Sequence, residues 1–202
     1  MNITFPQEQL TFIAPGWQKL QDLTFKMAKE VRDSELQFDR VVTLAKGGWP
    51  MSRTLADFLE ISEVQSMGLK FYKGIDSRMA KPVIYQDLPV DVSGESILLF
   101  DDVADTGESL AFAIDYLLER GAALITTACI YYKKRSRVKP SFFATQVDGW
   151  IVFPYELLET LRILATGWLA EGVTPEEVVQ RFIQLNFPEP QIRYFLEEVI
   201  LT

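Results

Sequence analysis

The feature that most constrains the fold is the run of residues 97–109, where an apolar segment, two adjacent carboxylates and a glycine-containing polar loop precede an amphipathic helix. The first four residues predict a strand buried on both faces, so Asp101 and Asp102 emerge where that strand leaves the core. Ligands of open α/β sheets bind at this edge. The loop after the acids combines backbone N–H groups, a glycine and the positive end of a helix dipole. The alternative is an ordinary strand, turn and capped helix with solvated acids, but the composite pattern favours a site for a phosphorylated sugar.

Strand-like and helical patterns alternate through the first three quarters of the chain. The predicted helices are 17–31, 50–59 and 109–120, and the predicted strands are 41–44, 64–69, 97–100 and 124–131. This alternation predicts an α/β fold with a mostly parallel central sheet flanked by helices. The polar stretch 73–89 has little periodicity and is interpreted as a long mobile loop.

From residue 157 onward the pattern is helical only, with a capping box and a first-turn proline at 174–177. We therefore predict one domain over residues 1–156 and a C-terminal appendage of three helices over residues 157–202. Its apolar residues are expected to pack in the core, and the alternative is that they form a dimer contact.

Composition excludes several function classes. A net charge of −8 argues against a general nucleic-acid or anionic-membrane surface, so an anion site must be local. The absence of histidine excludes His-ligated metals and Ser-His or Cys-His catalysis, which leaves the chemistry to carboxylates and lysines. The single cysteine, Cys129, lies in an apolar run and is expected to be a buried, inert thiol. With no signal-like N-terminus or membrane-length apolar run, a cytoplasmic location is the expectation.

Residues 97–109 closely resemble the phosphoribosyl pyrophosphate signature of the type I phosphoribosyltransferases. Two further segments match that family in order and spacing. Residues 45–50, Ala-Lys-Gly-Gly-Trp-Pro, resemble its pyrophosphate loop. Residues 150–156, Trp-Ile-Val-Phe-Pro-Tyr-Glu, resemble the purine-binding end of the 6-oxopurine branch, the xanthine-guanine enzymes especially. The resemblance covers about residues 16–156 and implies the type I phosphoribosyltransferase fold.

The resemblance also implies roles for residues of the first motif. Asp101 and Asp102 would bind the ribose 2- and 3-hydroxyls and, directly or through water, Mg2+ on the pyrophosphate. The physics agrees, because a divalent cation and hydroxyl donors relieve the repulsion between adjacent acids. The 5-phosphate would be held by the loop and helix start, comprising Ala104, Thr106, Gly107, Glu108 and Ser109. Many relatives carry a basic residue at the position of Glu108, which is expected to contribute mainly its N–H group.

At the reacting end, Asp105 would lie beside purine N7 and act as general base or acid, a role typically worth ~100- to 10,000-fold in rate. Lys133 would donate to the purine O6 and so favour a 6-oxopurine over adenine. Trp150 would stack on the base, and the Ile151 backbone would bind its edge. The pyrophosphate would be bound by the loop residues Ala45, Lys46, Gly47 and Gly48.

Other charged residues are expected to be less specific. The segment 73–89 corresponds to the flexible lid of the family, which excludes water from the reaction. Its cations are interpreted as ordinary surface charge, namely Lys73, Arg78 and Lys81. The cations after Lys133 are interpreted as a solvated basic turn, although any of them could contact phosphate, namely Lys134, Arg135 and Arg137.

The sequence thus predicts a cytoplasmic, Mg2+-dependent transferase that joins hypoxanthine, guanine or xanthine to phosphoribosyl pyrophosphate in purine salvage. The protein is expected to be a homodimer or higher homo-oligomer. One alternative is a non-catalytic sensor of a nucleotide or of phosphoribosyl pyrophosphate on the same fold. A pyrimidine or orotate transferase is a third reading, which Lys133 and Trp150 disfavour.

Overall fold

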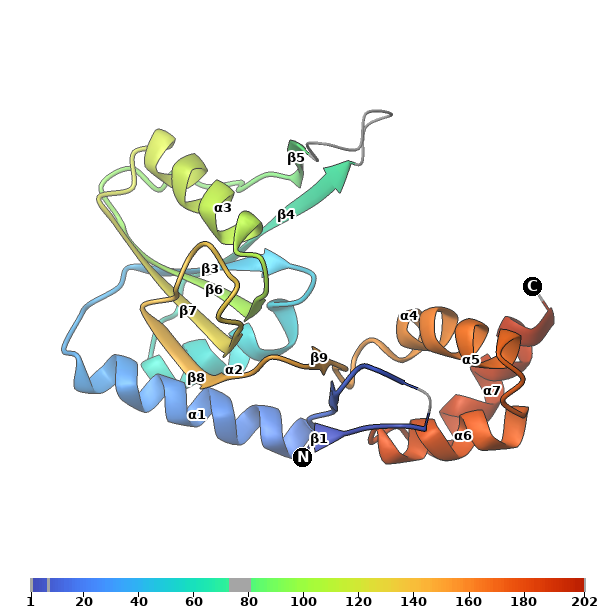
Figure 1. Ribbon diagram of the computed structural model, residues 1–202. Helices are drawn as coiled ribbons and strands as arrows, with labels where there is room; N and C mark the ends of the chain where they lie inside the picture. Colours follow the sequence, from blue (N-terminus) through green and yellow to red (C-terminus); the bar gives the residue numbers. More distant parts are fainter. Residues whose placement is uncertain (1, 7, 73–80, 202) are drawn as a thin grey trace. The chain divides into compact units, whose positions relative to one another are not determined.

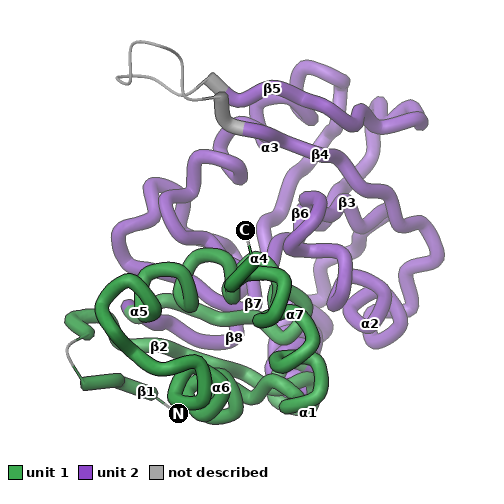
Figure 2. Tube along the Cα trace, turned by 90° about the vertical axis from the view of Figure 1, so that its right-hand side faces the viewer, with its two compact units in different colours: residues 1–20, 149–202 green, residues 21–148 purple. Residues whose placement is uncertain are grey.

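The computed structural model describes residues 2–6, 8–72 and 81–201 of the chain. It contains two compact units, one formed by residues 1–20 with 149–202 and the other by residues 21–148 (Figure 2). We call them unit 1 and unit 2. The expected division at residue 156 follows the change to all-helical sequence, whereas the units follow chain packing, which groups the N-terminal residues with the C-terminal helices.

Unit 2 is built on a six-stranded sheet of order β5-β4-β3-β6-β7-β8. Its strands are β3 (Arg40–Ala45), β4 (Val64–Tyr72), β5 (Lys81–Gln86), β6 (Ser96–Ala104), β7 (Leu124–Tyr132) and β8 (Phe142–Gln146). Neighbouring strands are parallel except for β5, which runs antiparallel to β4 at one edge. The prediction of an α/β fold with a mostly parallel sheet is therefore confirmed.

The helices of unit 2 cover the two faces of this sheet. Helix α3 (Glu108–Glu119) lies on one face, and α2 (Trp49–Leu59) lies on the other together with α1 (Trp17–Asp33) (Figure 1). Leu110, Ala113 and Leu117 of α3 are buried. They join the apolar residues of the strands in one core cluster, as their helical spacing predicts.

Three details of the sheet differ from the sequence prediction. The edge strand β8 was not predicted. Residues 81–86, expected to belong to a loop, form the edge strand β5, while residues 73–80 of that expected loop lie outside the described part of the chain. Strand β6 also continues past Phe100 to Ala104, because its last residues still pair with β7. Asp101 and Asp102 are thus part of the strand and not of the loop that follows it.

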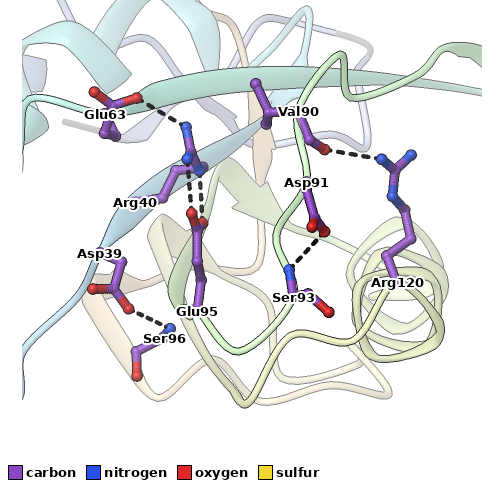
Figure 3. Close-up of polar contacts among 9 residues, drawn as sticks. All are labelled: Asp39, Arg40, Glu63, Val90, Asp91, Ser93, Glu95, Ser96 and Arg120. Carbon is purple, nitrogen blue, oxygen red and sulfur yellow. Dashed lines mark hydrogen bonds and ion pairs between the residues drawn. The ribbon is translucent and has the colours of Figure 1, made fainter.

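A charged cluster ties together the amino ends of the central strands (Figure 3). Arg40, at the start of β3, donates two hydrogen bonds of 2.7 and 2.8 Å to Glu95 and one of 3.0 Å to Glu63. Glu63 directly precedes β4 and Glu95 directly precedes β6. Only 9% of the Arg40 side chain is exposed, and Glu95 most strongly raises its pKa. This cluster aligns the starts of three neighbouring strands.

Unit 1 contains a small sheet and a set of helices. The sheet has the order β1-β2-β9, with β1 (Asn2–Ile3), β2 (Phe12–Ile13) and β9 (Trp150–Ile151). The helices are α4 (Leu157–Thr160), the π-helix η1 (Leu161–Ala165), α5 (Thr166–Ala170), α6 (Pro175–Gln184) and α7 (Glu189–Leu201). The Thr174 hydroxyl accepts a 3.2 Å hydrogen bond from Glu177 N–H, which confirms Thr174 as the N-cap of the predicted capping box.

The core of unit 1 joins its N-terminal strands to its helices. Phe12 of β2, Trp168 of α5 and Phe182 of α6 are each at most 2% exposed and belong to one apolar cluster. The prediction that the apolar residues of the C-terminal helices form a core therefore agrees with the structure of this unit. In the described part of the chain, no helix is both long and apolar enough to cross a membrane.

Candidate active site

Asp101 and Asp102 lie near the carboxyl end of β6, in surroundings that disfavour two charges. Asp102 is 6% exposed, and its backbone N–H donates a 3.0 Å hydrogen bond to Asp101 Oδ1. Burial and the nearby charge of Asp102 raise the pKa of Asp101 well above its ordinary value, although that hydrogen bond opposes the rise. Cys129, opposite Asp101 on β7, is buried as predicted, and burial raises the pKa of its thiol.

The loop after β3 lies directly against Asp102. A Cβ atom on Gly47 would stand 2.8 Å from Asp102 Cγ, so a side chain there would displace the carboxylate. Gly48 packs equally closely on Thr43, whose Oγ1 is buried and has no hydrogen-bond partner among the described residues. Lys46, joined to Ala45 by a cis peptide bond, is exposed. The structure therefore brings the predicted pyrophosphate loop onto one of the two predicted ribose-binding acids.

The predicted phosphate loop connects β6 to α3. Gly107 precedes the first residue of α3 and has a φ of 76°, a left-handed conformation that favours glycine. A Cβ atom there would also stand 2.8 Å from Val138 N. The first-turn N–H groups of α3, which include those of Glu108 and Ser109, have no intrahelical acceptors. Together with the exposed Thr106, this helix start can bind an anion.

Asp105, at the beginning of that loop, is held by two cations. Lys133 Nζ donates a 3.0 Å hydrogen bond to its Oδ2, and Arg135 Nε donates a 2.6 Å hydrogen bond to its Oδ1. Arg135 Nη2 contacts the same Oδ1. Burial raises the pKa of Asp105, but the hydrogen bonds and charges of Lys133 and Arg135 outweigh it and lower the pKa below its ordinary value. Asp105 is therefore a carboxylate at neutral pH.

Backbone hydrogen bonds hold the turn that carries both cations against the phosphate loop. Lys133 N–H donates to Ala104 O at 3.0 Å, and Arg137 N–H donates to Thr106 O at 2.9 Å. Within the turn, Ser136 N–H donates to Lys133 O at 2.9 Å. The positions of Lys133 and Arg135 relative to Asp105 thus follow from a turn that is already fixed.

The structure corrects one interpretation of the basic turn. Arg135, expected to be solvated, is an ion-pair partner of Asp105, although 65% of its side chain is exposed. Thr43 is a second residue at this end of the sheet that sequence reasoning missed. The only sequence signal for Arg135 is its position two residues after Lys133 in a turn rich in cations.

Trp150 and Ile151, which are predicted to bind the base, belong to unit 1. They form β9, whose Trp150 N–H donates a 2.8 Å hydrogen bond to Thr11 O. The Trp150 ring is partly buried and packs on Phe12, with 6.0 Å between ring centroids. Stacking of Trp150 on a base stays a prediction.

The carboxylates of Asp101 and Asp102 suit a metal ion that binds together with a substrate. No group of three or more His, Cys, Asp or Glu side chains that could hold a metal ion occurs in the described ranges. Asp101 and Asp102 are two adjacent carboxylates, and Mg2+ is usually bound by one or two carboxylates together with substrate phosphates. Burial and the charge of Asp102 raise the pKa of Asp101, and a bound cation would offset both effects.

A parallel sheet with acids, a glycine loop and a helix N-terminus at its carboxyl end defines an α/β protein that binds a phosphorylated ligand. Residues 16–159 match the phosphoribosyl transferase domain, so the chain belongs to this family of enzymes.

Individual relatives agree with the family assignment. The hypoxanthine-guanine phosphoribosyltransferase of Aquifex aeolicus is 31% identical over 127 residues, which cover 59% of this chain and 68% of that protein. The purine phosphoribosyltransferase structure from Pyrococcus horikoshii has a TM-score of 0.65 at 30% identity and covers 71% of this chain and 93% of that one. A hypothetical protein from Neisseria gonorrhoeae, solved with bound ppGpp, has a TM-score of 0.68 at 22% identity, with 80% and 99% covered.

Proposed function

We propose that this protein transfers the 5-phosphoribosyl group from phosphoribosyl pyrophosphate to a 6-oxopurine base, releasing pyrophosphate, in purine salvage. The observation that carries the proposal is the 3.0 Å contact between Lys133 and Asp105 beside the phosphate loop. An O6 donor and an N7 base must lie close together, because the two purine atoms are neighbours. The names of the Aquifex and Pyrococcus relatives support the same substrate class.

The phosphoribosyl end of the substrate would occupy the end of β6 and the start of α3. The 5-phosphate would accept hydrogen bonds from the first-turn N–H groups of α3 and from the hydroxyls of Thr106 and Ser109. The ribose hydroxyls would donate to Asp101 and Asp102. Mg2+ bound with the pyrophosphate would neutralise charge on the leaving group, and these two acids are the residues that would hold it.

The proton transfer falls to Asp105. As purine N9 attacks ribose C1 and the bond from C1 to pyrophosphate breaks, the Asp105 carboxylate takes the proton from N7. Lys133 orients the base by donating to O6. The departing pyrophosphate would be stabilised by Lys46 and the backbone N–H groups of the loop.

A panel of bases tests this function directly. Purified protein is incubated with phosphoribosyl pyrophosphate, with Mg2+ or with a chelator, and with hypoxanthine, guanine, xanthine, adenine, uracil or orotate. We expect Mg2+-dependent formation of the nucleotide from at least one 6-oxopurine and much less from adenine. Turnover of uracil or orotate alone would contradict the proposal and support a pyrimidine enzyme.

A second candidate function is a non-catalytic nucleotide sensor, which is favoured by the likeness to the Neisseria protein solved with bound ppGpp. Retention of Asp105 together with both ribose-binding acids favours the enzyme instead. The two are separated by calorimetric titration with ppGpp in parallel with the base panel. Tight binding of ppGpp by a protein that turns over none of the bases would establish the sensor.

Location and assembly are also part of the proposal. We infer a cytoplasmic protein, since its proposed substrates are intracellular metabolites. We infer a homodimer or higher oligomer because several large apolar side chains are exposed, among them Tyr194 at 67% and Ile163 at 51%. Light scattering coupled to size-exclusion chromatography tests the assembly, and a monomer at micromolar concentration would contradict it.

A further inference from the structure

The two cations on Asp105 differ in their surroundings. The Lys133 side chain is 8% exposed and reaches Oδ2 with one ammonium group. The Arg135 side chain is 65% exposed and reaches Oδ1 through both Nε and Nη2. A guanidinium that offers two N–H groups to one oxygen restrains the orientation of the carboxylate, whereas an ammonium is a point charge that can turn to another acceptor. The two contacts are therefore suited to different tasks.

The proposed reaction gives Lys133 two competing acceptors. In the free protein its ammonium is bound to Asp105 Oδ2, the oxygen that Arg135 does not hold. A 6-oxopurine brings a carbonyl oxygen that accepts a hydrogen bond, whereas the 6-amino group of adenine is a donor and cannot replace the carboxylate. Only an oxopurine can therefore draw the ammonium away from Asp105.

We propose that Arg135 is a positioning residue for the general base. This inference rests on the proposed purine transferase function. When O6 of the base draws Lys133 away, Arg135 keeps the Asp105 carboxylate oriented through Oδ1, and the vacated Oδ2 receives the N7 proton. Recognition of the 6-oxo group of the purine and release of Asp105 Oδ2 from Lys133 are then one event. Adenine leaves Oδ2 occupied, so it is discriminated against in the chemical step as well as in binding.

The backbone around the turn supports this assignment. Ala104 O and Thr106 O, on either side of Asp105, accept hydrogen bonds from the backbone of Lys133 and Arg137, respectively. The loop and the turn are thus joined without either cationic side chain. Loss of the exposed Arg135 guanidinium should leave the fold intact, because exposed ion pairs contribute little to stability.

Among the described residues, the charged groups that act on Asp105 are Lys133 and Arg135, and their effect on its pKa exceeds the opposing effect of burial. Removing Arg135 therefore raises the pKa of Asp105. Because an active general base must be deprotonated, the acid limb of the pH profile should then move to higher pH. A purely structural role for Arg135 would not move this limb.

The test compares Arg135→Gln, Arg135→Lys and the control Lys134→Gln, which removes the same charge from an exposed neighbour on the same turn. Steady-state rates are measured with hypoxanthine and adenine across pH, and thermal melting verifies folding. We expect Arg135→Gln to lower kcat with hypoxanthine by roughly 10- to 100-fold, with KM for phosphoribosyl pyrophosphate nearly unchanged and the acid limb displaced upward. Arg135→Lys should restore the acid limb and part of kcat, and Lys134→Gln should resemble the wild type.

The outcomes separate this inference from the proposed function. If the wild-type protein turns over hypoxanthine but Arg135→Gln and Lys134→Gln have the same kcat and the same acid limb, the positioning role is wrong and the proposed function stands. If the wild-type protein turns over none of the bases, both are wrong. A fall in kcat for hypoxanthine with a smaller fall for adenine supports the inference, because adenine never frees Oδ2.

Discussion

The two ends of the six-stranded sheet in unit 2 both carry buried charge, yet they differ in how that charge is balanced. At the amino end, Arg40 is bound by Glu63 and Glu95 through three hydrogen bonds. At the carboxyl end, Asp101 and Asp102 are consecutive residues of β6, and burial together with the charge of Asp102 raises the pKa of Asp101. The first arrangement pairs opposite charges, whereas the second places two acidic side chains next to each other in one strand.

This difference distinguishes a stabilising cluster from a binding site. Buried polar groups in proteins are normally paired, so an unpaired group needs an explanation. Thr43 Oγ1, buried and without a partner in the described part of the chain, also lies toward the carboxyl end of β3. Groups with strongly perturbed pKa values gather at functional sites for the same reason. We therefore expect substitutions at the amino end to change stability and those at the carboxyl end to change activity.

The largest effect is expected for Asp105→Asn. An amide keeps the size of the side chain but cannot accept the N7 proton, so kcat should fall by ~100- to 10,000-fold. The assay is Mg2+-dependent nucleotide formation from the preferred base. Because the amide leaves the buried Lys133 ammonium without its anionic partner, thermal melting must accompany the assay. Full activity in the variant would show that the proton is transferred elsewhere.

Arg40→Met should have the opposite signature, with a large loss of stability and no direct loss of activity. Removing one partner of a fully buried ion pair typically costs about 3–5 kcal/mol. Because Glu63 is 56% and Glu95 is 22% exposed, we expect about 2–3 kcal/mol here. Urea unfolding measures the free energy of unfolding, and kcat is measured on the folded protein.

Arg53→Met is a matched control for that experiment. Arg53 also pairs with a carboxylate, Asp57, at 2.9 Å, but its side chain is 77% exposed. Its loss should change the free energy of unfolding by no more than about 0.5 kcal/mol. Equal losses in Arg40→Met and Arg53→Met would contradict a special role of the buried cluster.

The sequence predicts contiguous motifs well but does not predict contacts between distant positions. The strand that carries the two acids and the helix after the loop could be predicted because that motif is contiguous, whereas the roles of the acids, the loop and Lys133 stay predictions. The pairing of Arg135 with Asp105 joins positions 30 residues apart, and the Arg40 cluster joins positions 55 and 23 residues apart. Such contacts depend on strand order and register, which the pattern of one segment does not contain.

The short strands were missed for a related reason. The strands β1, β2 and β9 are each two residues long and exist only because distant segments pair, as in the parallel pairing of Phe12 with Trp150. Strand β5 was missed because its short apolar run, residues 83–85, lies within a longer polar stretch that was interpreted as a loop. Nonlocal pairing is thus the part of the fold that a single sequence leaves open.

Gly47→Ala tests the close contact between the pyrophosphate loop and Asp102. The added methyl group would lie 2.8 Å from Asp102 Cγ, so either the loop or the carboxylate must shift. We expect KM for phosphoribosyl pyrophosphate to rise about tenfold, since a small displacement of a binding group has a large effect. Gly167→Ala is the control, because a Cβ atom there meets nothing within 4 Å. Unchanged kinetics in Gly47→Ala would mean that this contact is not part of binding.

The smallest expected effect is a gain of stability in Asp101→Asn. Burial and the charge of Asp102 raise the pKa of Asp101 in the folded protein, so the folded state binds more protons than the unfolded state above the ordinary value of 3.8. The stability of the wild type therefore falls as pH rises from that value through the raised pKa. An amide removes this loss, and we expect roughly 0.5–2 kcal/mol more stability at pH 7 without ligands.

Bound ligands should stabilise Asp101→Asn less than they stabilise the wild type. Mg2+ with phosphoribosyl pyrophosphate should raise the melting temperature of the wild type more than that of Asp101→Asn, because the carboxylate that the ligands neutralise is gone. Melting is followed at pH 4 and pH 7, with and without both ligands. A variant less stable than the wild type at pH 7 would show that the acid pair is already balanced within the chain. The carboxyl end of the sheet would then resemble the amino end, and the contrast between them would not mark a binding site.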